Sequence, residues 1–83
     1  MRYITQGMVN PDKFNIFVYF ARFESKSVID ALRDYAVVGH PQSVAADING
    51  VKRPNFNRDL EKLNKVAAKV ERCKEIDLAG KHD

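Results

Sequence analysis

Apolar residues recur at helical spacing over the last third of the chain. The run advances in steps of four, three, four and three residues: Phe56, Leu60, Leu63, Ala67 and Val70. This spacing lines one face of an α-helix over about four turns. The same side continues through Cys73 to about residue 76, and Pro54, which suits the first turn of a helix, precedes it. We therefore predict a long C-terminal helix over residues 54–76.

A second amphipathic pattern covers residues 28–36. Charged residues lie opposite its apolar positions, which are Val28, Ile29, Leu32, Tyr35 and Ala36. Ser25 or Ser27 can cap the start of this helix, because a serine hydroxyl accepts a hydrogen bond from a free N–H group of the first turn. Gly39 can adopt the left-handed conformation that commonly ends a helix. The pattern predicts an amphipathic helix that ends at Gly39.

The N-terminal apolar segment, residues 14–23, is hydrophobic on nearly every side. This is typical of a buried helix or a central strand, and the residues before it favour the helix. Asn10 can cap it, Pro11 suits its first position, and Asp12 complements the helix dipole. We interpret its aromatic side chains as core residues. The alternatives are a dimer surface or a platform on which bases stack.

Between these helices, residues 41–48 form a short segment with an apolar side, followed by the turn-forming pair Asn49-Gly50. A short helix, a glycine turn and a long helix with a cationic start are the parts of a helix-turn-helix. Counted from Gln42, the fifth, ninth, tenth and fifteenth positions of this motif hold the residue types it needs: Ala46, Gly50, Val51 and Phe56. We therefore predict an all-α fold, a small helical domain with a helix-turn-helix and a long C-terminal recognition helix.

The start of the predicted recognition helix carries side chains suited to DNA. Arginine and asparagine form paired hydrogen bonds with guanine and adenine edges, whereas lysine more often contacts phosphate. Polar residues at the start of the preceding helix, with its free N–H groups, can hold a phosphate. The predicted DNA-binding residues are Gln42, Ser43, Lys52, Arg53, Asn55, Asn57, Arg58 and Lys62.

Length and charge fit one small domain with an anionic partner. We expect a single domain over residues 1–83, with flexible ends at residues 1–9 and 77–83. The net charge is +3, and residues 52–72 hold seven Lys or Arg against three Asp or Glu. A basic segment favours nucleic acid. A solvated helix face is an equally good interpretation for three of these residues, Lys62, Lys65 and Lys69.

The sequence offers little for other chemistries. Cys73 is the only cysteine, which excludes an internal disulfide and a thiolate zinc site within one chain. His40 has no activated nucleophile or carboxylate pair near it, and we interpret it as a helix-boundary residue. We therefore expect no enzymatic activity, no metal and no cofactor. The longest apolar run, residues 16–21, is too short for a bilayer, and no secretory signal is evident, so we expect a cytoplasmic protein without membrane contact.

The segment VIDALRDYAVVGH, followed without a gap by the Phe56, Leu60, Leu63 frame, resembles the PapB-type transcription regulators of fimbrial and adhesin operons in enteric bacteria. The resemblance covers residues 14–76. It implies a small all-α helix-turn-helix protein that associates. It also implies oligomeric binding to AT-rich double-stranded DNA, which activates or represses pilus genes.

The chain departs from the PapB-type pattern at Pro54 and Asn55, where the family tends to place a glycine and an aromatic residue. A proline here should fix where the last helix begins. The choice of DNA groove is therefore open.

Two other hypotheses remain. The centre of the chain is similar to the KorA-type repressors of plasmid maintenance genes in six residues: Gly39, Pro41, Gln42, Ala46, Gly50 and Arg53. That resemblance implies a homodimer on a palindromic operator, but the upstream helix matches the fimbrial family better. The third hypothesis is a small protein-interaction module that pairs through its last helix, whose heptad spacing beyond Leu63 is too short for an autonomous coiled coil.

Overall fold

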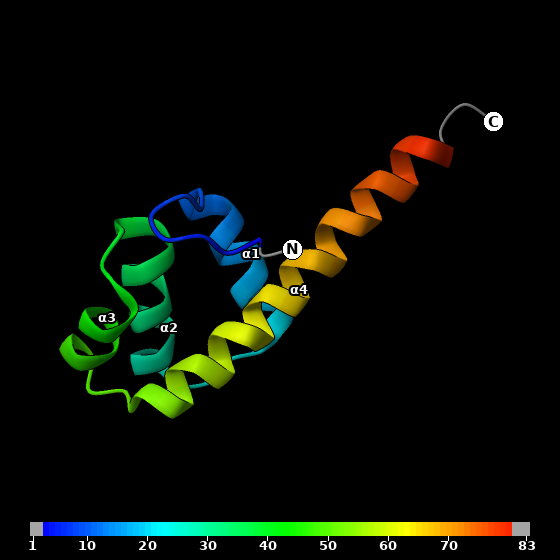
Figure 1. Ribbon diagram of the computed structural model, residues 1–83. Helices are drawn as coiled ribbons and strands as arrows, with labels where there is room; N and C mark the ends of the chain where they lie inside the picture. Colours follow the sequence, from blue (N-terminus) through cyan, green and yellow to red (C-terminus); the bar gives the residue numbers. More distant parts are fainter. Residues whose placement is uncertain (1–2, 81–83) are drawn as a thin grey trace.

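The computed structural model describes the backbone of residues 3–80 and the side chains of residues 3–73. Within these limits every regular element is a helix: α1 (Pro11–Ala21), α2 (Lys26–Arg33), the π-helix η1 (Asp34–Val38), α3 (Gln42–Ile48) and α4 (Arg53–Gly80). The first three α-helices pack against the first half of α4, and its second half projects from them (Figure 1). The molecule is elongated, with extents of 50 × 22 × 21 Å. The predicted all-α fold with a long C-terminal helix is confirmed.

Capping determines where α1 begins and ends. The Oδ1 atom of Asn10 accepts hydrogen bonds from two N–H groups of the first turn, at 2.8 and 3.4 Å, and Pro11 fills the first helical position, as predicted. The helix ends at Ala21, earlier than the apolar segment suggests. It ends there because Arg22 adopts the left-handed conformation, with φ 59°.

The helix formed by α2 and η1 starts as predicted but changes its winding before it ends. Of the two candidate caps, Ser25 is the one used, since its hydroxyl oxygen accepts a hydrogen bond from Val28 N–H (3.3 Å). The second half of the predicted helix is wound as the π-helix η1, a local feature that sequence periodicity does not signal. Gly39 ends it with φ 105°, and the N–H groups of Gly39 and His40 both donate to Asp34 O at 2.9 Å. The next two carbonyl groups are therefore free for another partner.

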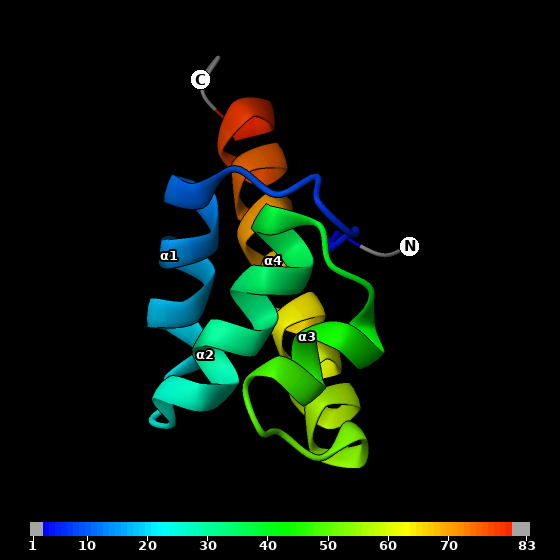
Figure 2. The same cartoon turned by 90° about the vertical axis from the view of Figure 1, so that its left-hand side faces the viewer.

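The segment before α1 is that partner. Gly7 N–H donates to Tyr35 O (2.9 Å) and Val9 N–H donates to Ala36 O (3.0 Å). Figure 2 shows the segment crossing the end of η1 on its way to α1. The contact is close, since a Cβ atom on Gly7, which has φ 68°, would lie 3.1 Å from Gly39 Cα. A side chain at this position would push the two segments apart.

Asn64 of α4 fixes the same segment from the other side. Its Oδ1 atom accepts hydrogen bonds from the N–H groups of Tyr3 (3.1 Å) and Ile4 (2.9 Å), and its Nδ2 atom donates to a carbonyl of the preceding turn (3.3 Å). Asn64 and Ile4 are both buried. The segment of residues 3–9, expected to be a flexible end, is thus hydrogen-bonded both to α4 and to η1, while residues 1–2 lie outside the described residues.

One hydrophobic core joins this segment to all the helices. From α4 it takes four apolar side chains at the predicted spacing: Phe56, Leu60, Leu63 and Ala67. Val70 is half-buried and Cys73 is exposed, so the prediction that Cys73 continues the apolar side is wrong. The turn that carries it lies beyond the packed part of α4 (Figure 1). Helix α4 extends past the predicted end to residue 80, and residues 81–83 lie outside the described residues.

Helices α3 and α4 begin within one residue of their predicted positions. Helix α3 starts at Gln42, with Pro41 as its cap residue rather than its first helical residue. Helix α4 starts at Arg53 rather than Pro54. The first residues of both helices are therefore the polar ones predicted to meet DNA.

Candidate nucleic-acid interface

A tight turn joins α3 to α4 and is held on two sides. Gly50 has φ 67°, and Val51 N–H donates to Ala46 O at 2.9 Å. The Nδ2 atom of Asn49 donates to Asp34 Oδ2 and to a carbonyl of α3, each at 2.8 Å. The second of these bonds holds the turn to α3 and the first holds it to η1. The direction in which α4 starts is thereby fixed.

Buried side chains hold α3 against the rest of the domain. Ala45 and Ala46 are fully buried, which lets the helix backbones approach closely, and Val51 is buried directly after the turn. The ring of Tyr35 meets that of Phe56 edge to face, with centroids 6.1 Å apart. This is the packing that the helix-turn-helix spacing requires.

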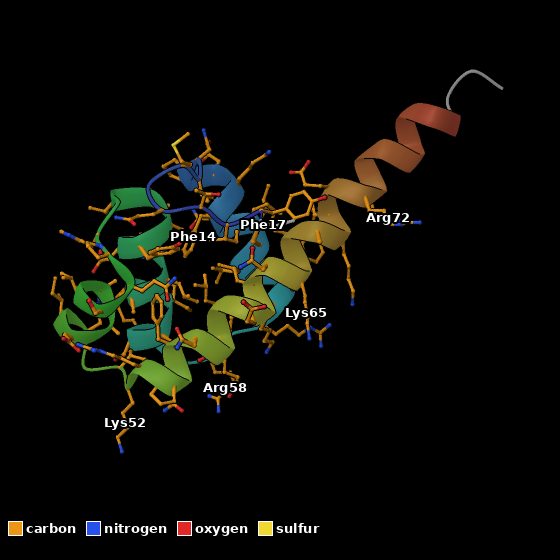
Figure 3. All side chains as sticks on the ribbon, viewed as in Figure 1. Phe14, Phe17, Lys52, Arg58, Lys65 and Arg72 are labelled. Atoms are coloured by element: carbon orange, nitrogen blue, oxygen red, sulfur yellow. The ribbon has the colours of Figure 1, made fainter. Side chains whose placement is uncertain are left out.

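The start of α4 exposes five of the predicted DNA-binding residues: Lys52, Arg53, Asn55, Asn57 and Arg58. Lys52 and Arg58 point away from the other helices (Figure 3). The five do not share one face, because successive helical residues are about 100° apart and Asn55 and Asn57 therefore lie on opposite flanks. Asn55, with Lys52 and Arg58, borders a shallow hollow of about 330 Å³ beside the start of α2.

Both arginines at the start of α4 make only weak ion pairs. The Nη2 atom of Arg53 lies 3.3 Å from Asp47 Oδ2, and both side chains are 64% exposed. The Nε atom of Arg58, whose side chain is 71% exposed, lies 3.5 Å from Asp59 Oδ1. Exposed pairs contribute about 0–1 kcal/mol. Either guanidinium group can therefore exchange its carboxylate for a phosphate or a base at little cost.

The remaining three predicted residues lie apart from this group. The ammonium of Lys62, one turn beyond Arg58, sits 5.0 Å from the ring centroid of Phe23, a contact that the sequence does not reveal. Gln42 is exposed and Ser43 half-buried at the start of α3. They lie about 10 Å from the turn along the axis of this seven-residue helix.

The two cations of α2 share one carboxylate, that of Asp30. Asp30 accepts hydrogen bonds from Lys26 Nζ (3.0 Å) and Arg33 Nη1 (3.1 Å). The hydrogen bond from Lys26 lowers the pKa of the Asp30 carboxyl group, and the charges of both cations add to this effect. Both cations of α2 are therefore engaged with Asp30 on their own helix.

The aromatic segment of α1 is only partly in the core. Phe14 and Phe17 are buried, as predicted, but Ile16, Tyr19 and Phe20 are 47%, 77% and 58% exposed. The core interpretation is wrong for these three residues, because the other helices cover one side of α1 only. The all-round apolar pattern of the segment was the available signal for such a surface.

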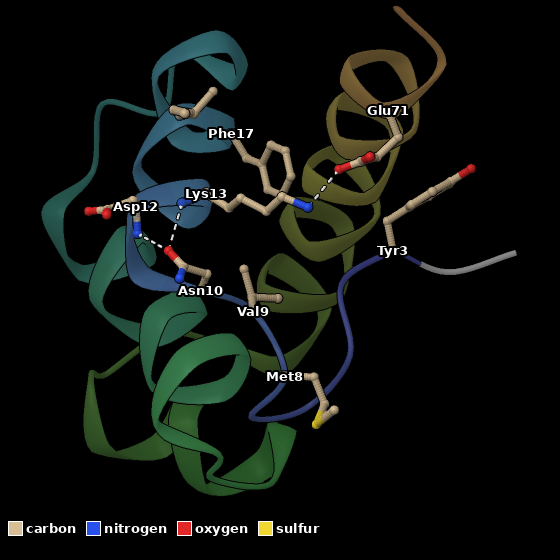
Figure 4. A pocket seen from close by; sticks show the side chains of 9 residues that line it. Tyr3, Met8, Val9, Asn10, Asp12, Lys13, Phe17 and Glu71 are labelled. Carbon is tan, nitrogen blue, oxygen red and sulfur yellow. Dashed lines mark hydrogen bonds and ion pairs between the residues drawn. The ribbon is translucent and has the colours of Figure 1, made fainter. Parts of the chain in front are cut away.

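A larger hollow, of about 620 Å³, lies between the N-terminal segment, α1 and α4 (Figure 4). Lys13 Nζ donates to Glu71 Oε1 across it at 3.0 Å. Its lining brings no nucleophile together with a base, and no group of metal ligands occurs among the described residues. Among the residues that the structure describes, no helix has both the length and the apolar composition needed to cross a bilayer.

Comparisons with known proteins identify the fold and the family. The structure is similar to the crystal structure of E. coli FocB at 1.4 Å resolution, with a TM-score of 0.82 and 22% sequence identity over 88% of this chain and 83% of that chain. At this identity the likeness shows a common fold. No curated protein matches the sequence.

The sequence itself matches a family of transcription regulators, not of enzymes, over residues 1–76. Regulators of this family bind DNA. The match agrees with the first of the two families that the sequence resembles. The chain belongs to the PapB family of adhesin biosynthesis transcription regulatory proteins.

Proposed function

We propose that the chain is a sequence-specific DNA-binding regulator of a fimbrial or adhesin operon, acting in the bacterial cytoplasm. One observation carries the proposal: Lys52, Arg53, Asn55 and Arg58 are exposed at the start of a helix whose direction is fixed by a hydrogen-bonded turn. Paired hydrogen bonds to a base need donors and acceptors in fixed positions. The start of α4 meets this requirement, and we place it in a groove of double-stranded DNA.

The side chains of this cluster take different roles. Asn55 and Arg58 border the same hollow and are placed to reach base edges together. Arg53 exchanges Asp47 for a DNA acceptor. Lys52, the cap residue of α4, contacts phosphate, because a flexible ammonium gives charge without paired geometry.

The outlying predicted residues contact DNA at the margins. Asn57, on the opposite flank of α4, faces the other wall of the groove. Lys62 contributes charge from the position beside Phe23. The side chains of Gln42 and Ser43 contact phosphate at the start of α3. These contacts position the protein and carry little sequence information.

We further propose that the preferred sites are AT-rich and that the protein binds them as a homodimer or a larger oligomer. An asparagine amide forms two hydrogen bonds with adenine, which supports a preference for A·T pairs at Asn55. The exposed apolar residues of α1, Ile16, Tyr19 and Phe20, support association, because such clusters usually meet a partner.

Selection of bound fragments from a random DNA pool tests the preference. Regularly repeated AT-rich sites are expected. A single palindromic site would favour the plasmid-type dimer instead, and no enrichment would contradict sequence recognition.

Gel-shift titration of substituted proteins on a selected site tests the residues. Arg53→Ala or Arg58→Ala should weaken specific binding by about 1–3 kcal/mol each, with circular dichroism unchanged. Lys13→Ala serves as a control, because it removes one positive charge near Glu71, far from the start of α4. Wild-type affinity in both arginine variants would refute the assignment of this surface.

A further inference from the structure

A row of cations runs along the outer face of α4, well beyond the surface proposed to read DNA. It consists of Arg58, Lys62, Lys65, Lys69 and Arg72, and we call it the outer basic row. Its steps repeat those of the buried apolar row, displaced by two residues, so it lies about 200° around the helix from the core. Arg58, Lys65 and Arg72 accordingly point away from the other helices (Figure 3).

The row is exposed and largely uncompensated. All five side chains are exposed. Among the described residues, Lys65, Lys69 and Arg72 form no ion pair. The acids Asp59 and Glu71 are turned toward the domain, with side chains 13% and 23% exposed.

Glu61 lies beside the row and reduces its charge at one turn only, since no acid occurs among residues 62–70. The outer basic row meets the surface proposed to contact bases at Arg58, which belongs to both.

The dimensions of the row suit a polyanion. From Arg58 to Arg72 the helix rises by about 21 Å. Over that distance one strand of duplex DNA carries about six phosphates. A straight row of five cations can therefore contact several phosphates at once if helix and duplex lie side by side.

We infer that the outer basic row lies along the phosphate backbone of the duplex whose groove receives the start of α4. This rests on the proposed function and adds an orientation to it: α4 lies lengthwise on the DNA rather than end-on. Arg58 keeps the base-edge contact proposed above, and Lys65, Lys69 and Arg72 supply attraction that is independent of sequence.

An anionic membrane would also attract cations, but the structure favours nucleic acid. A helix that lies on a membrane inserts an apolar face. The apolar face of α4 is buried in the core, and the exposed large hydrophobic residues of the described chain all lie outside α4. The outer basic row is also continuous, through Arg58, with the surface proposed to contact bases.

The test compares two triple variants of the full chain. Lys65→Gln, Lys69→Gln and Arg72→Gln together remove the charge, whereas Lys65→Arg, Lys69→Arg and Arg72→Lys keep it. All these residues favour helices to a similar degree. Affinity is measured over a salt series, on a selected duplex and on a scrambled duplex of equal length.

The charge-removing variant should bind both duplexes more weakly by the same factor, and the slope of log K against log salt should fall by about 3. The charge-keeping variant should behave like wild type. If circular dichroism shows that the triple variant is unfolded, Lys69→Gln alone should lower the slope by about 1.

An unchanged slope overturns the proposal for the row. An equal loss in the charge-keeping variant also overturns it, because charge would not be the cause. Binding of the charge-removing variant to vesicles that contain phosphatidylglycerol is measured in parallel. A loss of binding to these vesicles, with no change in binding to either duplex, also overturns the proposal.

These outcomes separate the two proposals. If wild type distinguishes the duplexes and the slope does not change, only the row is refuted. If wild type binds both duplexes equally and the slope falls, the row stands and sequence recognition fails.

Discussion

The inner and outer faces of α4 have the same spacing and opposite chemistry. Phe56, Leu60, Leu63 and Ala67 are buried on one face, and the outer basic row occupies the other. The inner face loses its partners after Val70, whereas the row continues to Arg72. One helix can thus hold the domain together and meet a charged partner, and substitutions on the two faces should have separable effects.

The largest effect is expected from Phe56→Ala on the inner face. Loss of a fully buried ring, with its edge-to-face contact to Tyr35, should cost about 3–5 kcal/mol of unfolding free energy. Urea unfolding measures the loss. Phe20→Ala is the matched control, since that ring is 58% exposed and its removal should cost far less. Equal losses would show that burial on α4 does not determine stability.

Asn64→Ala tests the polar residue of the inner face. The N–H groups of Tyr3 and Ile4 would lose their acceptor, and an unsatisfied buried group costs about 1–3 kcal/mol. Hydrogen exchange at the Ile4 amide should accelerate with the loss of stability. Asn57→Ala, on the exposed side of α4, should change stability by under about 0.5 kcal/mol. An unchanged exchange rate at Ile4 would contradict the role of Asn64.

Gly7→Ala asks whether the segment held by Asn64 also depends on its contact with Gly39. Alanine there meets left-handed strain of about 1–2 kcal/mol and, in addition, a backbone atom 3.1 Å away. Gly50→Ala has similar strain at φ 67° with nothing within 4 Å of the new Cβ. Thermal denaturation should therefore rank Gly7→Ala as the more damaging, and the reverse order would exclude a tight contact.

The smallest effect is expected on the outer face. Lys62→Ala removes the contact with Phe23 and should cost about 0.5–1 kcal/mol. Lys65→Ala, three residues on, should be neutral within about 0.5 kcal/mol. The denaturant midpoints of the two variants show whether Lys62 or Lys65 contributes to the stability of the fold. A large loss of stability in the Lys65→Ala variant would show that the outer face of α4 also stabilises the fold.

Local sequence signals predicted the ends of helices correctly where those ends depend on residues close by in the sequence. The caps at Asn10 and Ser25 and the left-handed glycines, Gly39 and Gly50, each act within a few residues. Packing of the N-terminal segment was missed because its acceptor, Asn64, is 60 residues away in sequence. The π-helix was missed for a related reason, since the carbonyl groups that it frees bond to that same distant segment.

The candidate interface shows the same division. Exposure of Lys52, Asn55 and Arg58 followed from their position at the start of an amphipathic helix. The Arg53–Asp47 pair crosses the turn, and the contact of Lys62 with Phe23 joins segments far apart in sequence. Neither contact produces a periodic pattern, so both needed the three-dimensional structure.

The elongated shape limits how closely copies can be spaced on DNA. A body 50 Å long laid lengthwise would cover about 15 base pairs, whereas its 22 Å width would cover about six. One helical turn of DNA is about 10 base pairs, so lengthwise neighbours on one side of the duplex could not occupy successive turns. They would have to skip a turn or alternate between sides, and the repeat length of a nuclease footprint would report which arrangement the protein uses.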